Sequence, residues 1–207
     1  MPAGRYVVLG DDGAPVGSEE FRCAPGPAGW RYFSDVKTVE PVPHDEVVDV
    51  VVDARWRPVR VRVESGAHRL LLEAADERLT GFRDGVRVET PWGPQSHVDY
   101  FTPATNLITT KRLTATAEIE VVFIEPFTLV HSLERQRYEL LADEEVATPA
   151  GRFAATRWRF TSLSTGWSAD LWTAGDVVVG YEALFELERY EPGATGVNPI
   201  DRPLTRP

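Results

Sequence analysis

Residues 57–64 read Arg-Pro-Val-Arg-Val-Arg-Val-Glu, and this stretch decides the fold class. Its valines, Val59, Val61 and Val63, occupy every second position, and charged side chains fill the positions between them. Successive side chains of a strand point to opposite faces, so the pattern predicts a strand with one buried and one solvated face. Such half-buried strands are typical of antiparallel sheets.

Short runs with the same alternation recur along the chain, and turn-forming residues separate them. The dipeptides Ser65-Gly66 and Asp84-Gly85 each lie between two such runs, where they predict tight hairpins. Most of the expected strands, about a dozen, connect directly to their neighbours, which favours a meander over βαβ units. We therefore expect a mainly β protein whose curved antiparallel sheet forms a half-barrel or barrel around one short helix.

The expected helix covers residues 102–113 and is the one clear interruption of the strand pattern. Thr102 is a good N-cap, and Pro103 suits the first helical position because its missing N–H would be unpaired there. Ala104, Leu107 and Ile108 share a face, so the helix is expected to pack an apolar side against the sheet.

The chain of 207 residues is 43% hydrophobic, which is enough for a substantial core. A single β half-barrel domain is expected over residues 1–190, since no linker or repeat divides them. Residues 191–207 are rich in proline and glycine and have no periodicity, so they are expected to form an extended or disordered tail.

Charge and cysteine content limit the partners and the compartment. The net charge of −10 disfavours binding to nucleic acid and to anionic membrane surfaces. Cys23 is the single cysteine, so an intrachain disulfide is impossible and a thiolate-rich zinc site is ruled out. The first residues lack the apolar core of a signal peptide, and apolar runs are too short to span a bilayer. We expect a cytoplasmic protein without integral membrane association.

Several segments together resemble a bacterial family of glycolipid-binding proteins. They cover roughly residues 46–190 and comprise 53–61 (DARWRPVRV), 99–106 (DYFTPATN), Arg112-Leu113, 121–124 (VVFI), 135–138 (RQRY) and 178–185 (VVGYEALF). The resemblance implies a curved β half-barrel like that of bacterial lipoprotein carriers, in which a sheet wraps a helix and an apolar cavity.

The sequence departs from the pattern of that family in three places. Ala104 stands where a phenylalanine is usual, and Tyr181-Glu182-Ala183 replaces a Tyr-Pro-Gly turn. An insertion over residues 149–172 adds a hairpin rich in aromatic side chains. Each departure concerns the interior or its rim, so the identity of the ligand is not carried over from the family.

No phosphate loop, dinucleotide fingerprint, paired-histidine zinc helix or nucleophile elbow is present, and neither a cofactor nor a metal is expected. His97 and Asp99 lie two apart on a strand and therefore on one face. They could be a catalytic base with its orienting acid, or a hydrogen-bonded pair near the start of the helix. Asp99 could also be a buried acid at the positive end of the helix dipole.

Three arginines are candidates for an anion clamp, because guanidinium binds carboxylate and phosphate bidentately. Arg135 and Arg137 alternate with Gln136 and Tyr138, so they could equally form a solvated face that pairs with nearby glutamates. Arg112 is the stronger candidate because it ends the helix, although it could also pair with a carboxylate on the sheet.

The other candidate ligand contacts are polar or aromatic. Asn106 could bind a ligand from the helix or bond the backbone in a turn. Tyr138 would add a ring and a hydroxyl donor. Trp167 and Trp172 lie in the inserted hairpin and are expected at the rim or in the pocket, where an aromatic face suits a flat ring or a sugar.

Three functions follow from these residues. The first is the binding of a lipid, glycolipid or other hydrophobic metabolite in the half-barrel, through Asn106, Arg112, Tyr138, Trp167 and Trp172. The second is a cofactor-independent isomerase, cyclase or hydrolase in the same cavity, with Asp99, His97, Arg112 and Tyr138 as its catalytic candidates. The third is a protein-interaction module that uses a sheet face. The oligomeric state does not follow from the sequence.

Overall fold

A computed structural model describes residues 1–193, and these form fifteen strands and one helix. The first eight strands are β1 (Ala3–Leu9), β2 (Pro15–Gly26), β3 (Gly29–Thr38), β4 (His44–Asp53), β5 (Pro58–Ser65), β6 (His68–Ala75), β7 (Arg78–Arg83) and β8 (Val86–Pro91). The remaining elements are β9 (His97–Asp99), α1 (Pro103–Arg112), β10 (Ala117–Ile124), β11 (His131–Thr148), β12 (Gly151–Ser162), β13 (Ser168–Ala174), β14 (Val177–Tyr181) and β15 (Phe185–Glu191).

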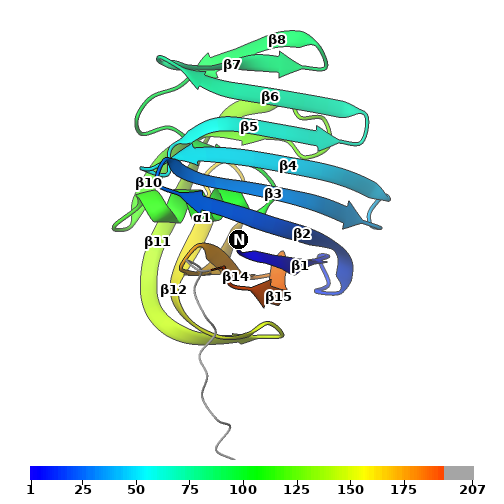
Figure 1. Cartoon of the computed structure of the whole chain (residues 1–207), viewed down its shortest axis with the longest axis vertical. Helices are drawn as coiled ribbons and strands as arrows, with labels where there is room; N and C mark the ends of the chain where they lie inside the picture. The colour runs from blue at the N-terminus through cyan, green and yellow to red at the C-terminus, as the bar shows by residue number, and fades with distance from the viewer. Residues whose placement is uncertain (194–207) are drawn as a thin grey trace, which may run out of the picture.

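All fifteen strands belong to one curved sheet in the order β8-β7-β6-β5-β4-β3-β2-β1-β15-β14-β13-β12-β11-β10-β9. The first and last described strands pair with each other, and this pairing joins the two halves of the meander. Neighbours are antiparallel except β9 and β10, which run parallel. Figure 1 shows α1 between the strands β2–β5 and the long strands β11 and β12. The predicted mainly β fold, a curved sheet around one short helix, is confirmed.

Helix α1 begins and ends as the sequence predicted. Thr102 has an extended backbone, and its hydroxyl accepts a hydrogen bond from the N–H of Ala104. Lys111 and Arg112 occupy the last turn, where positive charge offsets the negative end of the helix dipole. The helix is buried on all sides over residues 103–110, threonines and Asn106 included, so packing against one face of the sheet was too narrow an expectation.

The two predicted hairpins are present. Gly66 follows β5 with a φ of 56°, and Asp84 and Gly85 join β7 to β8 with φ values of 52° and 79°. Two consecutive left-handed residues form the turn whose twist matches that of the flanking strands. Glycine supplies this conformation without strain, which explains why these dipeptides end the strands.

Strand β5 departs from the alternation expected over residues 57–64. Val61 and Val63 are fully buried, whereas Val59 is 37% exposed. The register with β4 shifts there, because Val52 pairs with Pro58 while Val51 pairs with Arg60. The extra residue forms a β-bulge, which turns Val59 to solvent and Pro58 inward.

The sheet remains open between its two edge strands, and the loop after β10 lies across the opening. The carbonyl oxygen of Pro126 accepts a hydrogen bond from the Ser65 hydroxyl at 2.7 Å. The carbonyl oxygen of Thr128 accepts another from the Arg83 guanidinium at 3.1 Å. These contacts bring the loop against β5 and β7, and they position Pro126 beside the interior.

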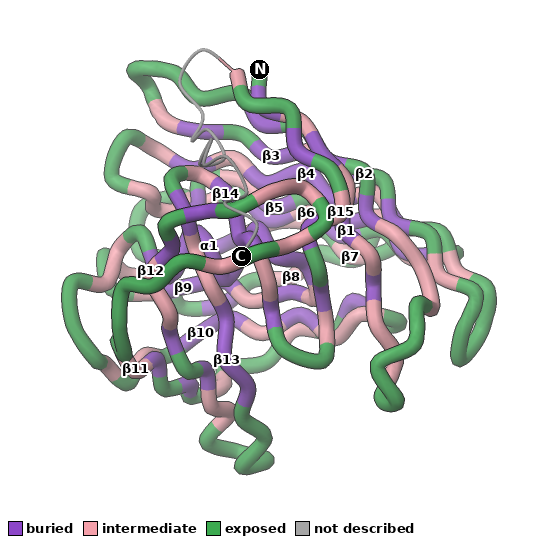
Figure 2. The backbone as a smooth tube through the Cα atoms, turned by 90° about the horizontal axis from the view of Figure 1, so that it is seen from below, coloured by how far each residue is buried: buried purple, intermediate pink, exposed green. Residues whose placement is uncertain are grey.

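Burial follows the inner surface of this sheet and the helix, while the turns are exposed (Figure 2). One aromatic row crosses the first three strands, where the ring of Phe21 stacks on Tyr6 and Tyr32 with centroids 4.8 and 5.6 Å apart. Aromatic pairs of this kind contribute about 0.5–1.5 kcal/mol each beyond their buried area. The row forms part of the buried core inside the first three strands.

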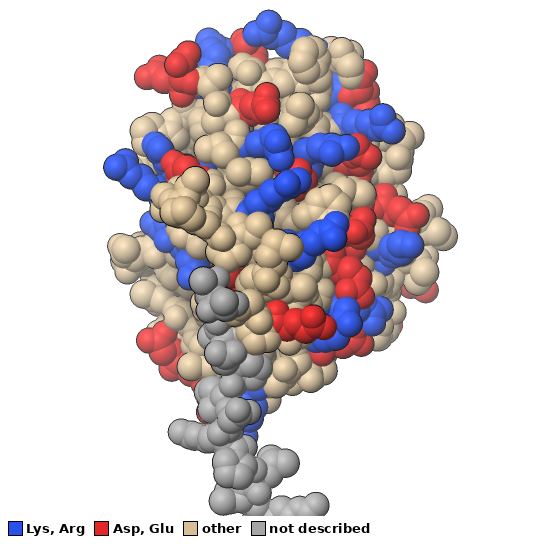
Figure 3. Space-filling view, viewed as in Figure 1, with Lys and Arg blue, Asp and Glu red and all other residues tan. Residues whose placement is uncertain are grey.

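The outer face carries both signs of charge (Figure 3). Asp49 receives the guanidinium groups of Arg31 and Arg60 at 2.8 and 3.0 Å, and Arg5 pairs with Glu188 at 2.6 Å. Within residues 1–193, no helix is long and apolar enough to cross a bilayer. The tail expected over residues 191–207 lies outside the described residues from 194 onward, while Glu191 pairs with Ala3 at the end of β15.

Candidate functional site

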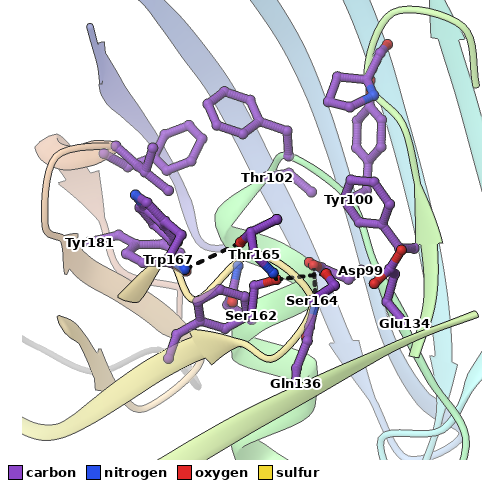
Figure 4. A pocket seen from close by; sticks show the side chains of 17 residues that line it. Asp99, Tyr100, Thr102, Glu134, Gln136, Ser162, Ser164, Thr165, Trp167 and Tyr181 are labelled. Atoms are coloured by element: carbon purple, nitrogen blue, oxygen red, sulfur yellow. Dashed lines mark hydrogen bonds between the residues drawn. The ribbon is translucent and has the colours of Figure 1, made fainter. Parts of the chain in front are cut away.

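A cavity of about 350 Å³ opens at the N-terminal end of α1 (Figure 4). We call it the aromatic cavity, because seven of its lining residues are aromatic. Seventeen side chains line it: Asp99, Tyr100, Phe101, Thr102, Asn106, Phe123, Pro126, Glu134, Gln136, Phe160, Ser162, Ser164, Thr165, Trp167, Tyr181, Leu184 and Phe185. They come from the end of β9, from the start of α1, from the strands that follow the helix in the chain and from the loops between these strands, so only the folded sheet assembles them.

Asp99 and Gln136 form the polar floor of the aromatic cavity. The amide nitrogen of Gln136 donates to one carboxylate oxygen of Asp99 at 2.5 Å, and the Thr105 hydroxyl donates to the other at 3.3 Å. Gln136 is only 3% exposed, and its Oε1 has no hydrogen-bond partner in residues 1–193. A buried carbonyl oxygen without a donor is uncommon, so a ligand donor is an obvious complement to it.

Burial raises the pKa of Asp99 to about 6, although the hydrogen bonds from Gln136 and Thr105 oppose the rise. The carboxyl therefore changes charge close to neutral pH. A group with such a pKa at the floor of a cavity is suited to receive a proton or to bind a positive charge.

Three rings from different elements meet at the wall beside this floor. Phe160 on β12 lies 5.7 Å from Trp167 and 6.3 Å from Tyr181, measured between ring centroids. Trp167 and Tyr181 are 6.2 Å apart, and their planes are inclined by 51°. Trp167 is 41% exposed and stands at the mouth of the aromatic cavity.

The turn that carries Trp167 is held by its own hydroxyl groups. The Ser162 and Ser164 hydroxyls are hydrogen-bonded to each other at 3.1 Å. The Thr165 hydroxyl accepts a hydrogen bond from the backbone N–H of Trp167 at 3.2 Å. Figure 4 shows these residues along the rim. Short local bonds of this kind restrict the backbone of the turn that carries Trp167.

Two further buried carboxylates lie behind the wall. Thr102 and Tyr32 both donate hydroxyl hydrogen bonds to Oε1 of Glu19 at 2.7 Å. Tyr100 donates to Glu46 at the same distance. Burial raises the pKa of Glu19 to about 7, against these hydrogen bonds, and the charge of Glu46 adds to the rise. Tyr100 and Thr102 therefore face the aromatic cavity while their hydroxyls are anchored to the sheet.

His97 and Asp99 share the face of β9 that packs on the helix, as the strand spacing implied. His97 Nδ1 lies 3.2 Å from the Thr109 hydroxyl, whereas Asp99 contacts Thr105, one helical turn away. Burial and then the nearby charge of Arg112 lower the pKa of His97 to about 3, so its ring is neutral. His97 does not line the aromatic cavity but lies in a separate surface hollow at the other end of α1.

Arg112 is also outside the aromatic cavity. Its guanidinium donates to the backbone oxygens of Ser96 and Pro94 at 2.6 and 2.7 Å, which ties the end of α1 to the loop before β9. This geometry differs from both alternatives expected from the sequence, because Arg112 binds backbone oxygens and does not line the aromatic cavity. Arg135 and Arg137 lie on the exposed face of β11 and pair with glutamates, as the solvated-face alternative expected.

The remaining candidates are divided between the interior and the outer surface. Asn106 lines the aromatic cavity from within the helix, and its Oδ1 accepts the hydroxyl hydrogen of buried Tyr138 at 2.8 Å. Tyr138 lies one layer behind the lining. Trp172 is on the outside of the sheet, where its indole donates to Glu144 and Arg157 lies 5.5 Å from its ring.

Gln136, Phe160 and Tyr181 are among the lining residues that the sequence did not single out as candidate ligand contacts. A signal for Gln136 was present, because a residue between two solvent-facing arginines on a strand must point inward. Phe160 and Tyr181 had no comparable signal, since nothing local distinguishes a ring that lines a cavity from a ring that fills the core. Residues 1–193 contain no group of three or more His, Cys, Asp or Glu placed to hold a metal ion.

The sequence matches no family model, and no curated protein matches it. Several solved structures share its fold, and two of them match over most of the chain. A DUF1089 family protein from Pseudomonas aeruginosa superposes with a TM-score of 0.55 at 20% identity, over 81% of this chain and 91% of that one. A β-barrel-like protein of the domain of unknown function DUF1849 from Brucella abortus gives 0.50 at 7% identity, over 92% and 96%. At such identities the likeness establishes a β-barrel-like fold alone.

Proposed function

We propose that the protein binds a small hydrophobic molecule in the aromatic cavity. The observation that carries this proposal is a ring-lined cavity of about 350 Å³ whose buried floor leaves Oε1 of Gln136 without a partner among residues 1–193. Ligand sites are mostly apolar, with a few polar groups that fix the orientation of the ligand. The aromatic wall and the Asp99–Gln136 floor have this character.

The volume limits the size of the ligand. A water molecule occupies about 30 Å³ in the liquid, so the aromatic cavity holds roughly a dozen atoms of that size. A compound with one or two rings, or a single short chain, fits within it. Only one chain or one sugar of a glycolipid would enter, with the rest outside the mouth beside Trp167. If the ligand is a glycolipid, as in the family that the sequence resembles, we therefore propose that only one of its chains or sugars is bound inside the aromatic cavity.

Native mass spectrometry of the full chain tests the proposal directly, by detecting a co-purified small molecule. Thr165→Trp places a large ring at the rim and is expected to abolish binding. Leu163→Trp is the matched control, because Leu163 is exposed on the same turn and does not line the aromatic cavity. Equal ligand occupancy in both variants would refute binding at this place.

A second function, catalysis without a cofactor, is favoured by Asp99 alone among the four catalytic candidates. Asp99 lines the aromatic cavity, is oriented by Gln136 and Thr105, and has a pKa of about 6. These are the properties of a general base that works at neutral pH in an isomerase or cyclase. Asp99→Asn would then abolish turnover of the co-purified compound at saturating ligand concentration. Turnover by the Asp99→Asn variant would exclude this role.

A further inference from the structure

We infer that the ligand of the aromatic cavity is an apolar compound that carries a protonated amine. This inference rests on the proposed function, and it names the chemical class of the ligand at the same site. It follows from three separate features: the sign of the charges that line the aromatic cavity, an unpartnered oxygen at its floor, and the arrangement of its rings.

The charged side chains of the lining are both acidic. They are Asp99 and Glu134, and none of the seventeen lining residues is Lys, Arg or His. The arginines proposed from the sequence to bind an anionic headgroup lie elsewhere: Arg112 at the far end of α1, and Arg135 and Arg137 on the solvent face. A carboxylate or phosphate would meet only like charge here, which disfavours it.

The hydrogen-bonding capacity left at the floor calls for a donor. The Gln136 amide nitrogen already donates to Asp99. The Gln136 oxygen can only accept a hydrogen bond, and it has no donor among residues 1–193. An ammonium group has three donors, so one group bound to the Asp99 carboxylate can also serve this oxygen once the Gln136 side chain, whose oxygen is covered in this structure, rotates toward it. Charge-assisted hydrogen bonds of this type are the stronger ones.

The rings next to the floor suit the same charge. Phe160, Trp167 and Tyr181 have centroids 5.7–6.3 Å apart and planes inclined by 51–69°. Rings so arranged can face one point within the distance of about 6 Å at which a cation is attracted to each of them. Asp99 lies near this cluster, because its charge contributes, after burial, to the raised pKa of Tyr181.

A matched set of ligands tests the inference on the full chain. 4-Phenylbutylamine, 4-phenylbutan-1-ol and 4-phenylbutanoate have nearly the same size and differ in the charge of one end. We expect the amine to bind about ten- to a hundredfold more tightly than the alcohol, which is the effect of one charged hydrogen bond, and the acid to bind most weakly. Isothermal titration calorimetry at pH 7.5 and 0.15 M salt measures all three.

Two variants separate the site from the overall negative charge of the protein. Asp99→Asn keeps the size of the side chain, and Gln136 can turn its amide to pair with it, so folding should be retained. This variant should bind amine and alcohol equally. Glu118→Gln removes a carboxylate of the solvent face, where Glu118 pairs with Arg135, and should keep the full preference for the amine.

The outcomes distinguish this inference from the proposed function. If the alcohol or the acid binds the unaltered protein as tightly as the amine, the aromatic cavity still binds ligands but the ammonium inference is wrong. A preference that persists in the Asp99→Asn variant, or that Glu118→Gln also abolishes, overturns it in the same way. If none of the three compounds binds, the ammonium inference fails, while the co-purification experiment still decides the proposed function.

Discussion

The hydroxyl of Thr102 donates a hydrogen bond to Glu19 at 2.7 Å, and its oxygen also accepts from the backbone of Ala104. One side chain thus caps the helix and fastens the helix start to strand β2, although 83 residues separate it from Glu19. The cap and the buried acid together position the helix end at which the aromatic cavity opens.

Replacing Glu19 with Gln should weaken the dependence of stability on pH. The pKa of Glu19 is about 7 in the folded protein against a usual 4.5, so the folded state holds the proton more tightly. Its stabilising contribution is complete below pH 4.5 and is lost as the pH rises through 7. Between pH 4.5 and 8 the unaltered protein should therefore lose up to about 3 kcal/mol of unfolding free energy through Glu19. The Glu19→Gln variant should not show this part of the loss.

Urea unfolding at these two pH values measures this difference. Glu20→Gln is the control, because Glu20 is the exposed neighbour on the same strand and pairs with Arg5 and Arg189. The raised pKa values of Asp99 and Glu46 act in the same direction and persist in both variants. An unchanged pH profile in the Glu19→Gln variant would show that Glu19 is not the titrating group.

Replacing Thr102 with Val should destabilise the protein by about 1–3 kcal/mol. The change removes the helix cap and one of the two donors to buried Glu19, while the side-chain shape is kept. Thr102→Ser retains the hydroxyl and should recover most of the loss. Urea midpoints of the three proteins measure these losses, and equal losses in the valine and serine variants would show that the hydroxyl alone does not account for the effect.

Replacing Arg112 with Met should lower stability and leave ligand affinity unchanged. The guanidinium satisfies two backbone oxygens of the loop before β9, and losing these bonds should cost about 1–3 kcal/mol. Arg112 does not line the aromatic cavity. Thermal unfolding and a binding titration on one preparation test both statements. A loss of affinity at unchanged stability would return Arg112 to the binding site.

Two tryptophans of the same hairpin should respond differently to replacement. Trp167→Leu removes a ring from the mouth of the aromatic cavity and should weaken binding of an aromatic ligand about tenfold. Trp172→Leu removes a ring from the outer face and should leave the affinity unchanged. Titrations of both variants with the same ligand compare them. Equal losses would mean that the hairpin as a whole, and not the Trp167 ring, determines binding.

Much of the fold could be predicted because its signals are local. Alternation, the Asp84-Gly85 turn and the Thr102-Pro103 helix start depend on the conformations of a few adjacent residues, which the side chains themselves restrict. The bulge at Val59 escaped prediction, since it depends on the register with a neighbouring strand. The parallel pairing of β9 with β10 escaped it for the same reason.

The candidate site could be predicted only in part. Asp99, Asn106 and Trp167 were identified from the sequence and line the aromatic cavity, whereas Arg112 and Trp172 lie outside it. Arg112 shows why: the sequence indicates that it ends a helix, but not which end of the helix faces the cavity. Glu19 had an unused signal, because it alternates in step with buried Phe21 and Cys23.

The sequence by itself determined the β class, the single helix with its cap, the hairpins and the solvent face that carries Arg135 and Arg137. The tertiary structure alone decided that β1 pairs with β15, that Gln136 reaches Asp99, and that three rings from three elements surround one floor. The reason is physical: local patterns fix the direction of a side chain relative to its own strand. Which distant strand it then meets depends on the curvature and register of the whole sheet.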